Sequence, residues 1–91
     1  MNYGKEIYIV TSRWGTCMGN PEVYYTKKDA ETRAKQIVLG AVRDDYDGTS
    51  VNPSERVLKN WANKNGDFSD YYWCNNDFAT EAEVTKAVIN I

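Results

Sequence analysis

The sequence predicts an α+β fold, a small antiparallel sheet with two helices packed on one face. Short runs of β-branched and aromatic residues, typical of strands, stand near both ends of the chain. Two stretches with helical periodicity and helix-start signals lie between them. Ninety-one residues is the length of one domain. We therefore expect a single domain over residues 1–91, with the element order β-β-α-α-β-β.

The first two strands are expected over residues 7–10 and 22–25. Residues 7–10 read Ile-Tyr-Ile-Val, which is apolar on both faces and typical of a central strand. Residues 12–20 contain two glycines and precede Pro21, which predicts a loop. The two strands would then pair as an antiparallel hairpin with a long tip.

The first helix is expected to begin after Thr26, whose hydroxyl can accept a hydrogen bond from the amide of Asp29. Gly40 weakens the last turn, so the helix can end anywhere from Leu39 to Asp44. Its buried face consists of small and β-branched residues at helical spacing: Ala30, Ala34, Ile37, Val38, Ala41 and Val42.

The second helix is expected to begin at Asn52, which would be its N-cap. Pro53 suits the first helical position, and Glu55 would complete the capping box. Asn65 and Gly66 predict its end, because glycine can take the positive φ of a helix C-cap.

The last two strands are expected over residues 71–74 and 81–91. Residues 81–91 combine strand-like alternation with good helix formers, so helix and strand both remain open for them. Their closing Val-Ile-Asn-Ile favours a strand.

Several function classes have little support in the composition. The chain has no histidine, which is the commonest general base and a frequent metal ligand. Cys17 and Cys74 match no zinc or redox spacing. The acidic run at Asp44, Asp45 and Asp47 lacks the full calcium-loop pattern and is interpreted as a solvated turn. We expect no enzyme activity, no cofactor and no metal.

The chain shows no apolar run of the ~20 residues that a membrane helix needs. It also shows no secretory leader, because its first residues lead directly into a strand. We therefore expect a soluble cytoplasmic protein that has no contact with membranes and keeps both thiols reduced.

Residues 67–78 are the predicted contact segment. They hold five aromatic residues and three carboxylates, with no Lys or Arg, and aromatic anchors beside charge are typical of interaction surfaces. Because neighbouring side chains of a strand point to opposite faces, either Tyr71 with Trp73 or Tyr72 with Cys74 faces outward. The outward pair would form a patch with Tyr8, which a homodimer or a partner protein would cover, or the terminal segment would bury. The predicted partner-binding residues are Tyr8, Asp70, Tyr71, Tyr72, Trp73 and Asp77.

A nucleotide site is the second hypothesis. Trp14 could stack on a base while Arg13, Lys27 and Lys28 contact phosphates, so that an oligomer would sequester a signalling nucleotide. The alternative for this segment is an ordinary hairpin tip, with Trp14 packed onto the sheet.

Charge is unevenly distributed along the chain. Residues 1–43 carry seven Lys/Arg and four Asp/Glu, whereas residues 44–91 carry four Lys/Arg and nine Asp/Glu. A net charge of −2 makes direct binding to duplex nucleic acid unfavourable. The acidic half could instead complement a basic protein surface, or mimic a nucleic acid in a basic groove.

The run from Tyr8 to Ser12, the segment Val23–Thr26 and the charged start of the first helix at Lys27–Glu31 resemble the opening of many short bacteriophage-encoded accessory proteins. The resemblance extends over most of the chain through its general layout, and it transfers no functional residue. It implies a non-enzymatic role in the host cytoplasm. The expected function is therefore binding to a host protein, as an inhibitor of a defence system or of a host enzyme.

Overall fold

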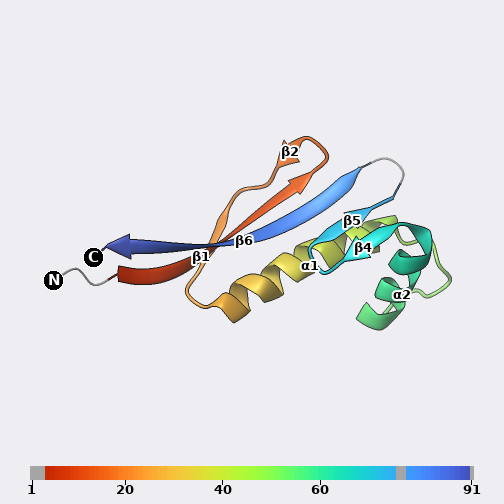
Figure 1. Cartoon of the computed structure of the whole chain (residues 1–91). Coiled ribbons are helices and arrows are strands. Elements are labelled where there is room, and N and C mark those ends of the chain that lie inside the picture. Colours follow the sequence, from red (N-terminus) through yellow and green to blue (C-terminus); the bar gives the residue numbers. More distant parts are fainter. Residues whose placement is uncertain (1–3, 76–77, 91) are drawn as a thin grey trace.

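The computed structural model describes residues 4–75 and 78–90. It has the predicted α+β fold, a six-stranded antiparallel sheet with two helices (Figure 1). Two very short strands, β2 and β4, were not expected from the sequence. The elements in chain order are β1 (Gly4–Trp14), β2 (Cys17–Met18), β3 (Glu22–Tyr24), α1 (Lys27–Asp45), α2 (Glu55–Asn65), β4 (Asp67–Ser69), β5 (Tyr72–Cys74) and β6 (Ala79–Asn90).

A long ribbon of β1 and β6 forms the centre of the sheet. The strand order is β2-β1-β6-β5-β4, and β3 also pairs with β1. The register between β1 and β6 runs without interruption from Gly4 opposite Asn90 to Trp14 opposite Thr80. The strand expected over residues 81–91 is therefore confirmed for its described residues, and it begins two residues earlier than expected.

The predicted loop at residues 12–20 is partly wrong. Strand β1 continues to Trp14, and a tight turn at Gly15 reverses the chain into β2. Gly15 has a φ of 58°, which glycine adopts without strain. The expected pairing of the first two strands is confirmed, with Tyr8 opposite Tyr24.

Both helices begin with a side-chain cap, although one cap was misassigned. The Thr26 hydroxyl accepts a hydrogen bond from the amide of Asp29, as predicted. Helix α1 then continues through Gly40 to Asp45. Helix α2 is capped by Ser54, not by Asn52, so it starts later than the sequence indicates.

Gly66 ends α2 for a reason other than the predicted one. Its φ is −176°, which is extended backbone and not the left-handed region. A Cβ at this position would collide with the carbonyl oxygen of Cys74 and lie 3.0 Å from the indole of Trp73. Glycine is required here because β5 approaches closely.

The core lies between the sheet and the two helices. Trp73 is its largest buried side chain, and its ring centroid lies 5.6 Å from that of Trp61 on α2. The Trp73 indole nitrogen donates to Asp45 at 2.7 Å, and that of Trp61 donates to Asp47 at 3.0 Å. The acidic residues at the end of α1 and just after it, interpreted above as a solvated turn, therefore supply acceptors for the indole of the buried Trp73 and the partly buried Trp61.

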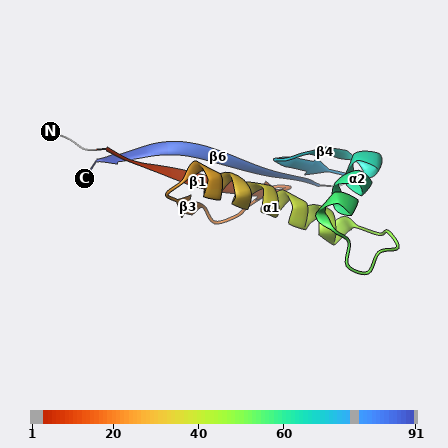
Figure 2. The ribbon, with the colours of Figure 1, turned by 90° about the horizontal axis from the view of Figure 1, so that it is seen from below.

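Both helices cover the same face of the sheet, as predicted (Figure 2). Val10 and Val84 lie opposite each other in the register and pack in the helix-covered core. Since side chains alternate along a strand, the odd-numbered residues of β1 and β6 point to the other face. No helix among the described residues is long and apolar enough to cross a bilayer.

Candidate functional site

The structure separates the residues of the predicted contact segment. Trp73 is 1% exposed and belongs to the core, so its side chain is not available to a partner, contrary to the prediction. Tyr72 pairs with Glu81 and lies on the opposite face, half-buried. Asp70 is exposed and lies 3.9 Å from Lys35 on α1. Asp77 falls outside the described residues.

Of the two patches expected for Tyr8, one with Tyr72 and one with Tyr71 and Trp73, the patch with Tyr72 does not form. Tyr8 is opposite Lys86, five positions from Glu81, so the two tyrosines point to different faces of the sheet. Tyr8 instead lines a hollow of about 580 Å³ beside α1, together with Tyr71 and Lys27. Tyr8 and Tyr71, which one of the two expected patches contained, thus lie together, and the predicted ligand residue Lys27 lies beside them.

The predicted nucleotide site is not assembled. Arg13 and Trp14 are neighbours in a strand and therefore point to opposite faces. Arg13 is engaged on its own face, where its guanidinium lies 3.0 Å from the carboxylate of Glu81. Lys27 and Lys28 begin α1, whereas the hollow beside Trp14 is lined by the C-terminal half of that helix.

A groove along α1, from Arg33 towards its C-terminal end, is the candidate site. We define the α1 groove by Trp14, Arg33, Ile37, Gly40, Arg43 and Phe78, which line a hollow of about 750 Å³. Trp14 and Phe78 form its aromatic wall, with ring centroids 5.2 Å apart. Both remain more than half exposed, at 56% and 54%. Exposed aromatic pairs of this kind are typical of anchor points for a partner.

The Gly15 turn holds this aromatic wall in place. The amide of Gly15 donates to the carbonyl of Ala79 at 2.8 Å, which ties the end of β1 to the start of β6. A Cβ on Gly15 would approach the ring of Phe78 to 2.9 Å. The turn therefore leaves room for Phe78 to lie against Trp14.

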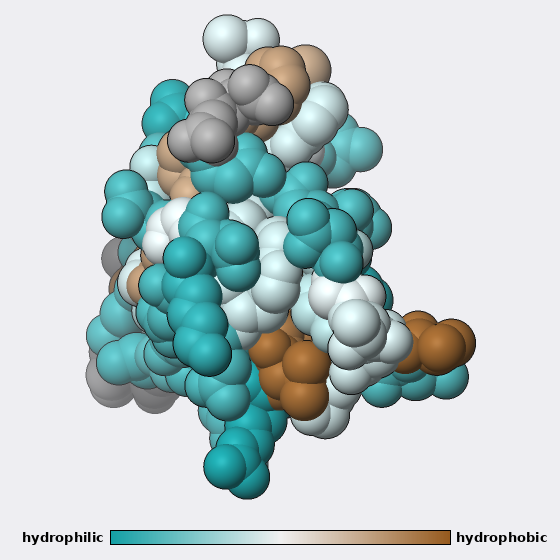
Figure 3. Space-filling view, turned by 90° about the vertical axis from the view of Figure 1, so that its right-hand side faces the viewer, coloured by the Kyte–Doolittle hydropathy of each residue, from teal (hydrophilic) through white to brown (hydrophobic). Residues whose placement is uncertain are grey.

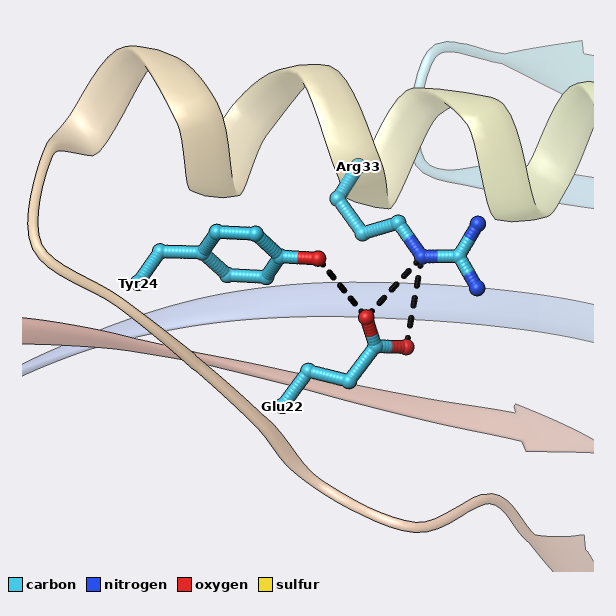
Figure 4. A network of polar contacts seen from close by, with 3 residues as sticks. All are labelled: Glu22, Tyr24 and Arg33. Carbon is cyan, nitrogen blue, oxygen red and sulfur yellow. Dashed lines mark hydrogen bonds and ion pairs between the residues drawn. The ribbon is translucent and has the colours of Figure 1, made fainter.

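Arg33 is held in a fixed position at the other end of the groove (Figure 4). Its Nε donates to both carboxylate oxygens of Glu22, at 3.1 and 3.2 Å, and the Tyr24 hydroxyl donates to the same carboxylate at 2.7 Å. The two terminal nitrogens point away from Glu22. They can donate hydrogen bonds to an anionic group of a ligand, and the fixed guanidinium reduces the entropy lost when that group binds.

Gly40 forms an open place in the floor of the groove. It lies in the interior of α1, where glycine costs about 0.5–1 kcal/mol relative to alanine. A Cβ built on Gly40 would meet no atom of the described residues within 4 Å, so the packing of those residues does not require glycine there. The missing side chain gives a partner access to the helix backbone.

The groove is electrically mixed. Arg33 and Arg43 line it together with Asp44 and Asp45, which balances two guanidinium groups with two carboxylates. Asp45 also accepts hydrogen bonds from Trp73 and Asn75, which fix its position. A ligand that matches this groove carries charges of both signs, or few charges, beside an apolar group.

The hydrogen bonds among Glu22, Tyr24 and Arg33 shift the pKa values of all three residues. The Tyr24 hydroxyl, and next the Arg33 guanidinium, hold the pKa of Glu22 below its ordinary value. The same carboxylate raises the pKa of Tyr24 and of Arg33 through its hydrogen bonds. All three groups therefore keep their usual charge at neutral pH.

The other pKa shifts among the described residues also leave each group in its usual charge state at neutral pH. Each moves a pKa away from neutrality, downward for carboxylates and upward for lysines and tyrosine, whereas a general acid or base works best with a pKa near the operating pH. The residues concerned are Glu6, Glu55, Lys59, Tyr72 and Lys86. Within residues 4–75 and 78–90, no three His, Cys, Asp or Glu side chains gather in a way that could hold a metal ion.

Sequence reasoning missed three residues of the groove, Arg33, Gly40 and Arg43, whereas Phe78 belonged to the predicted contact segment without being named as a contact residue. Gly40 did carry a signal, because a glycine inside an otherwise good helix pattern often has a packing or functional reason.

No family model, curated protein or solved structure matches this chain.

Proposed function

We propose that this chain is a small, non-enzymatic binding protein whose α1 groove receives a segment of a partner protein. The observation that carries the proposal is Gly40, a helix-interior glycine that no contact among residues 4–75 and 78–90 explains. It lies between an exposed aromatic wall and a fixed guanidinium, and the three together form an apolar anchor site beside an anion site.

The partner segment has a defined chemistry under this proposal. An apolar side chain packs on Trp14 and Phe78 over the open floor at Gly40, and a carboxylate of the segment pairs with Arg33. The resemblance to bacteriophage accessory proteins extends the proposal to a host protein in the cytoplasm, which the chain would inhibit by covering its surface.

The test is capture of the partner by variants that fill the groove. Gly40→Leu places a side chain over the floor of the groove, where nothing within 4 Å obstructs it. We expect immobilised Gly40→Leu to lose a host protein that the wild-type chain retains. Asn60→Leu adds the same side chain to an exposed position of α2 and is the matched control. Retention of the same protein by Gly40→Leu, at unchanged affinity, would overturn the proposal.

A nucleotide is the second candidate for the same groove, because Trp14 offers a stacking surface and Arg33 and Arg43 offer phosphate contacts. Asp44 and Asp45 oppose it, since they repel the several negative charges of a nucleotide. Thermal-shift measurements with nucleotides, and a search for copurified nucleotide by absorbance at 260 nm after denaturation, distinguish the two candidates.

Nucleic-acid mimicry has less support than either. Several carboxylates of the acidic half are engaged within the fold, which leaves fewer of them to imitate phosphate groups. Asp45 and Asp47 hold indole nitrogens, and Asp70 and Glu81 form ion pairs with Lys35 and Arg13.

A further inference from the structure

The face of the sheet opposite the helices carries a row of apolar side chains. We define the bare face by Ile7, Ile9, Val23, Tyr25, Ala87 and Ile89, of which Ile7 is already buried in the monomer, at 8% exposure. Val23 is 54% exposed, Tyr25 68% and Ile89 46%. By contrast, the end of the molecule that carries α2 is mostly hydrophilic, with small separate apolar patches (Figure 3).

Part of the bare face lies on a two-stranded extension of the molecule. The paired ends of β1 and β6 project beyond the start of α1, so no helix supports them (Figure 1). The radius of gyration is 15.5 Å, against about 12 Å expected for a compact chain of this length. A two-stranded ribbon is marginally stable in water by itself, so this extension needs a further contact.

We infer that the bare face binds a second copy of this chain, sheet against sheet, with the two β1–β6 ribbons running in opposite directions. Paired residues form successive rows across the ribbon: Lys5 with Ile89, Ile7 with Ala87, Ile9 with Thr85, and Thr11 with Glu83. A twofold axis between the two central rows places the apolar rows of the copies against each other. Packed sheets lie about 10 Å apart, a distance that these side chains fill.

Charge complementarity supports this occupant. In the antiparallel arrangement, the row of Lys5 and Ile89 in one copy faces the row of Thr11 and Glu83 in the other copy. Lys5 of one copy therefore lies over the row that holds Glu83 of the other. The symmetry creates this contact twice. Lys5 is already turned over the bare face, because its ammonium lies 4.5 Å from the centre of the Tyr25 ring.

The alternative parallel arrangement is less favourable. It would place every row on its own counterpart and bury the Arg13–Glu81 ion pair of both copies. Burying ion pairs costs desolvation energy that their attraction does not reliably offset. The antiparallel arrangement leaves this pair in water, beyond the overlap.

The overlap is small. Four rows extend roughly 20 Å along the strands, and three strands extend about 15 Å across them, so each copy contributes about 300 Å². This area is below that of standard specific interfaces, so the dimer is expected to be weak and to form only at high protein concentration. The α1 grooves remain on the outer surfaces of both copies, so this inference is independent of the proposed function.

Analytical ultracentrifugation over a concentration series tests the inference. We expect Lys5→Glu and Glu83→Lys each to weaken self-association by roughly tenfold, because each converts two attractions into repulsions. The double variant, with both charges exchanged, restores the attractions and should return the dissociation constant close to the wild-type value. Val23→Asp, at an exposed position, should abolish the dimer without unfolding the monomer.

Lys86→Glu provides the matched control. Lys86 pairs with Glu6 on the helix-covered side of the same ribbon, so its reversal should leave self-association unchanged. A wild-type chain that stays monomeric throughout the concentration series would overturn the inference. So would single reversals without effect, or a double variant no tighter than the singles.

Discussion

The two faces of the β1–β6 ribbon contain side chains of similar hydrophobicity in different surroundings. Val10 is 1% exposed under α1, whereas its neighbour Ile9 lies on the bare face. Burial of one face fixes the register of the strands, because a slip by one residue would exchange the two sets of side chains. The covered face therefore determines the fold, and the bare face is free to serve binding.

Trp73 and Tyr72 provide the strongest test of this difference. Trp73→Ala removes the largest core side chain and leaves Asp45 without its indole donor, so we expect a loss of about 3–5 kcal/mol in the free energy of unfolding. Tyr72→Ala, on the other face, should cost about 1 kcal/mol. Urea unfolding followed by far-UV circular dichroism measures both. Equal losses would contradict the assignment of the two faces.

Val10 and Ile9 provide a finer comparison. Val10→Ala should lower the free energy of unfolding by about 2 kcal/mol, because it leaves a cavity in the core. Ile9→Thr keeps the β-branched shape and should cost less than about 1 kcal/mol in the monomer. Unfolding at low protein concentration isolates the monomer. A greater loss for Ile9→Thr would show that the bare face is buried in the monomer itself.

Gly40→Ala should raise the stability of the chain and weaken its capture of the partner protein. Alanine in the helix interior is favoured over glycine by about 0.5–1 kcal/mol, and no neighbour obstructs the added methyl group. Thermal unfolding and partner capture are measured on the same samples. Asn60→Ala on the exposed side of α2 is the control for helix propensity alone. An unchanged or lower Tm for Gly40→Ala would show that the glycine has a structural role within the fold.

The smallest effect concerns the acid stability of the Glu22 network. Because hydrogen bonds from Tyr24 and Arg33 depress the pKa of Glu22, its contribution is complete above the unfolded pKa of about 4.5 and is lost as the pH falls through the lower folded value. The site is partly exposed, so the contribution is below about 1 kcal/mol. Glu22→Gln should reduce the loss of stability between pH 7 and pH 3, measured as the change in Tm. A wild-type profile in this variant would contradict the assignment.

The sequence was sufficient for the fold class because hydrophobic periodicity and capping residues are local properties. The Thr26 cap and the strand at the C-terminal end follow from neighbouring residues alone. The sequence could not determine which alternate residues of 71–74 are buried, since that depends on the face that α1 covers. The sequence left two alternatives, burial of Trp73 or burial of Tyr72 and Cys74, and the packing of Trp73 against Trp61 shows that Trp73 is the buried residue.

The candidate site was less predictable because it is assembled across long sequence distances. Arg33 acquires its fixed position from Glu22 on β3, and Phe78 meets Trp14 only after β1 and β6 have paired. Arg13 and Trp14 were grouped because they are neighbours in the sequence, yet the extension of β1 to Trp14 places them on opposite faces. Local reasoning identified good ligand-binding residue types but could not determine which of them converge.

The pairing of β1 with β6 also determines how this chain reaches its native state. Its longest uninterrupted register joins residues 4–14 to residues 80–90, so the central contacts of the sheet close almost the largest loop that the chain can form. Closing such a loop requires a large loss of chain entropy before native contacts compensate it. We therefore expect folding in milliseconds to seconds, slower than a helical protein of this length, with pairing of these two strands as the rate-limiting event.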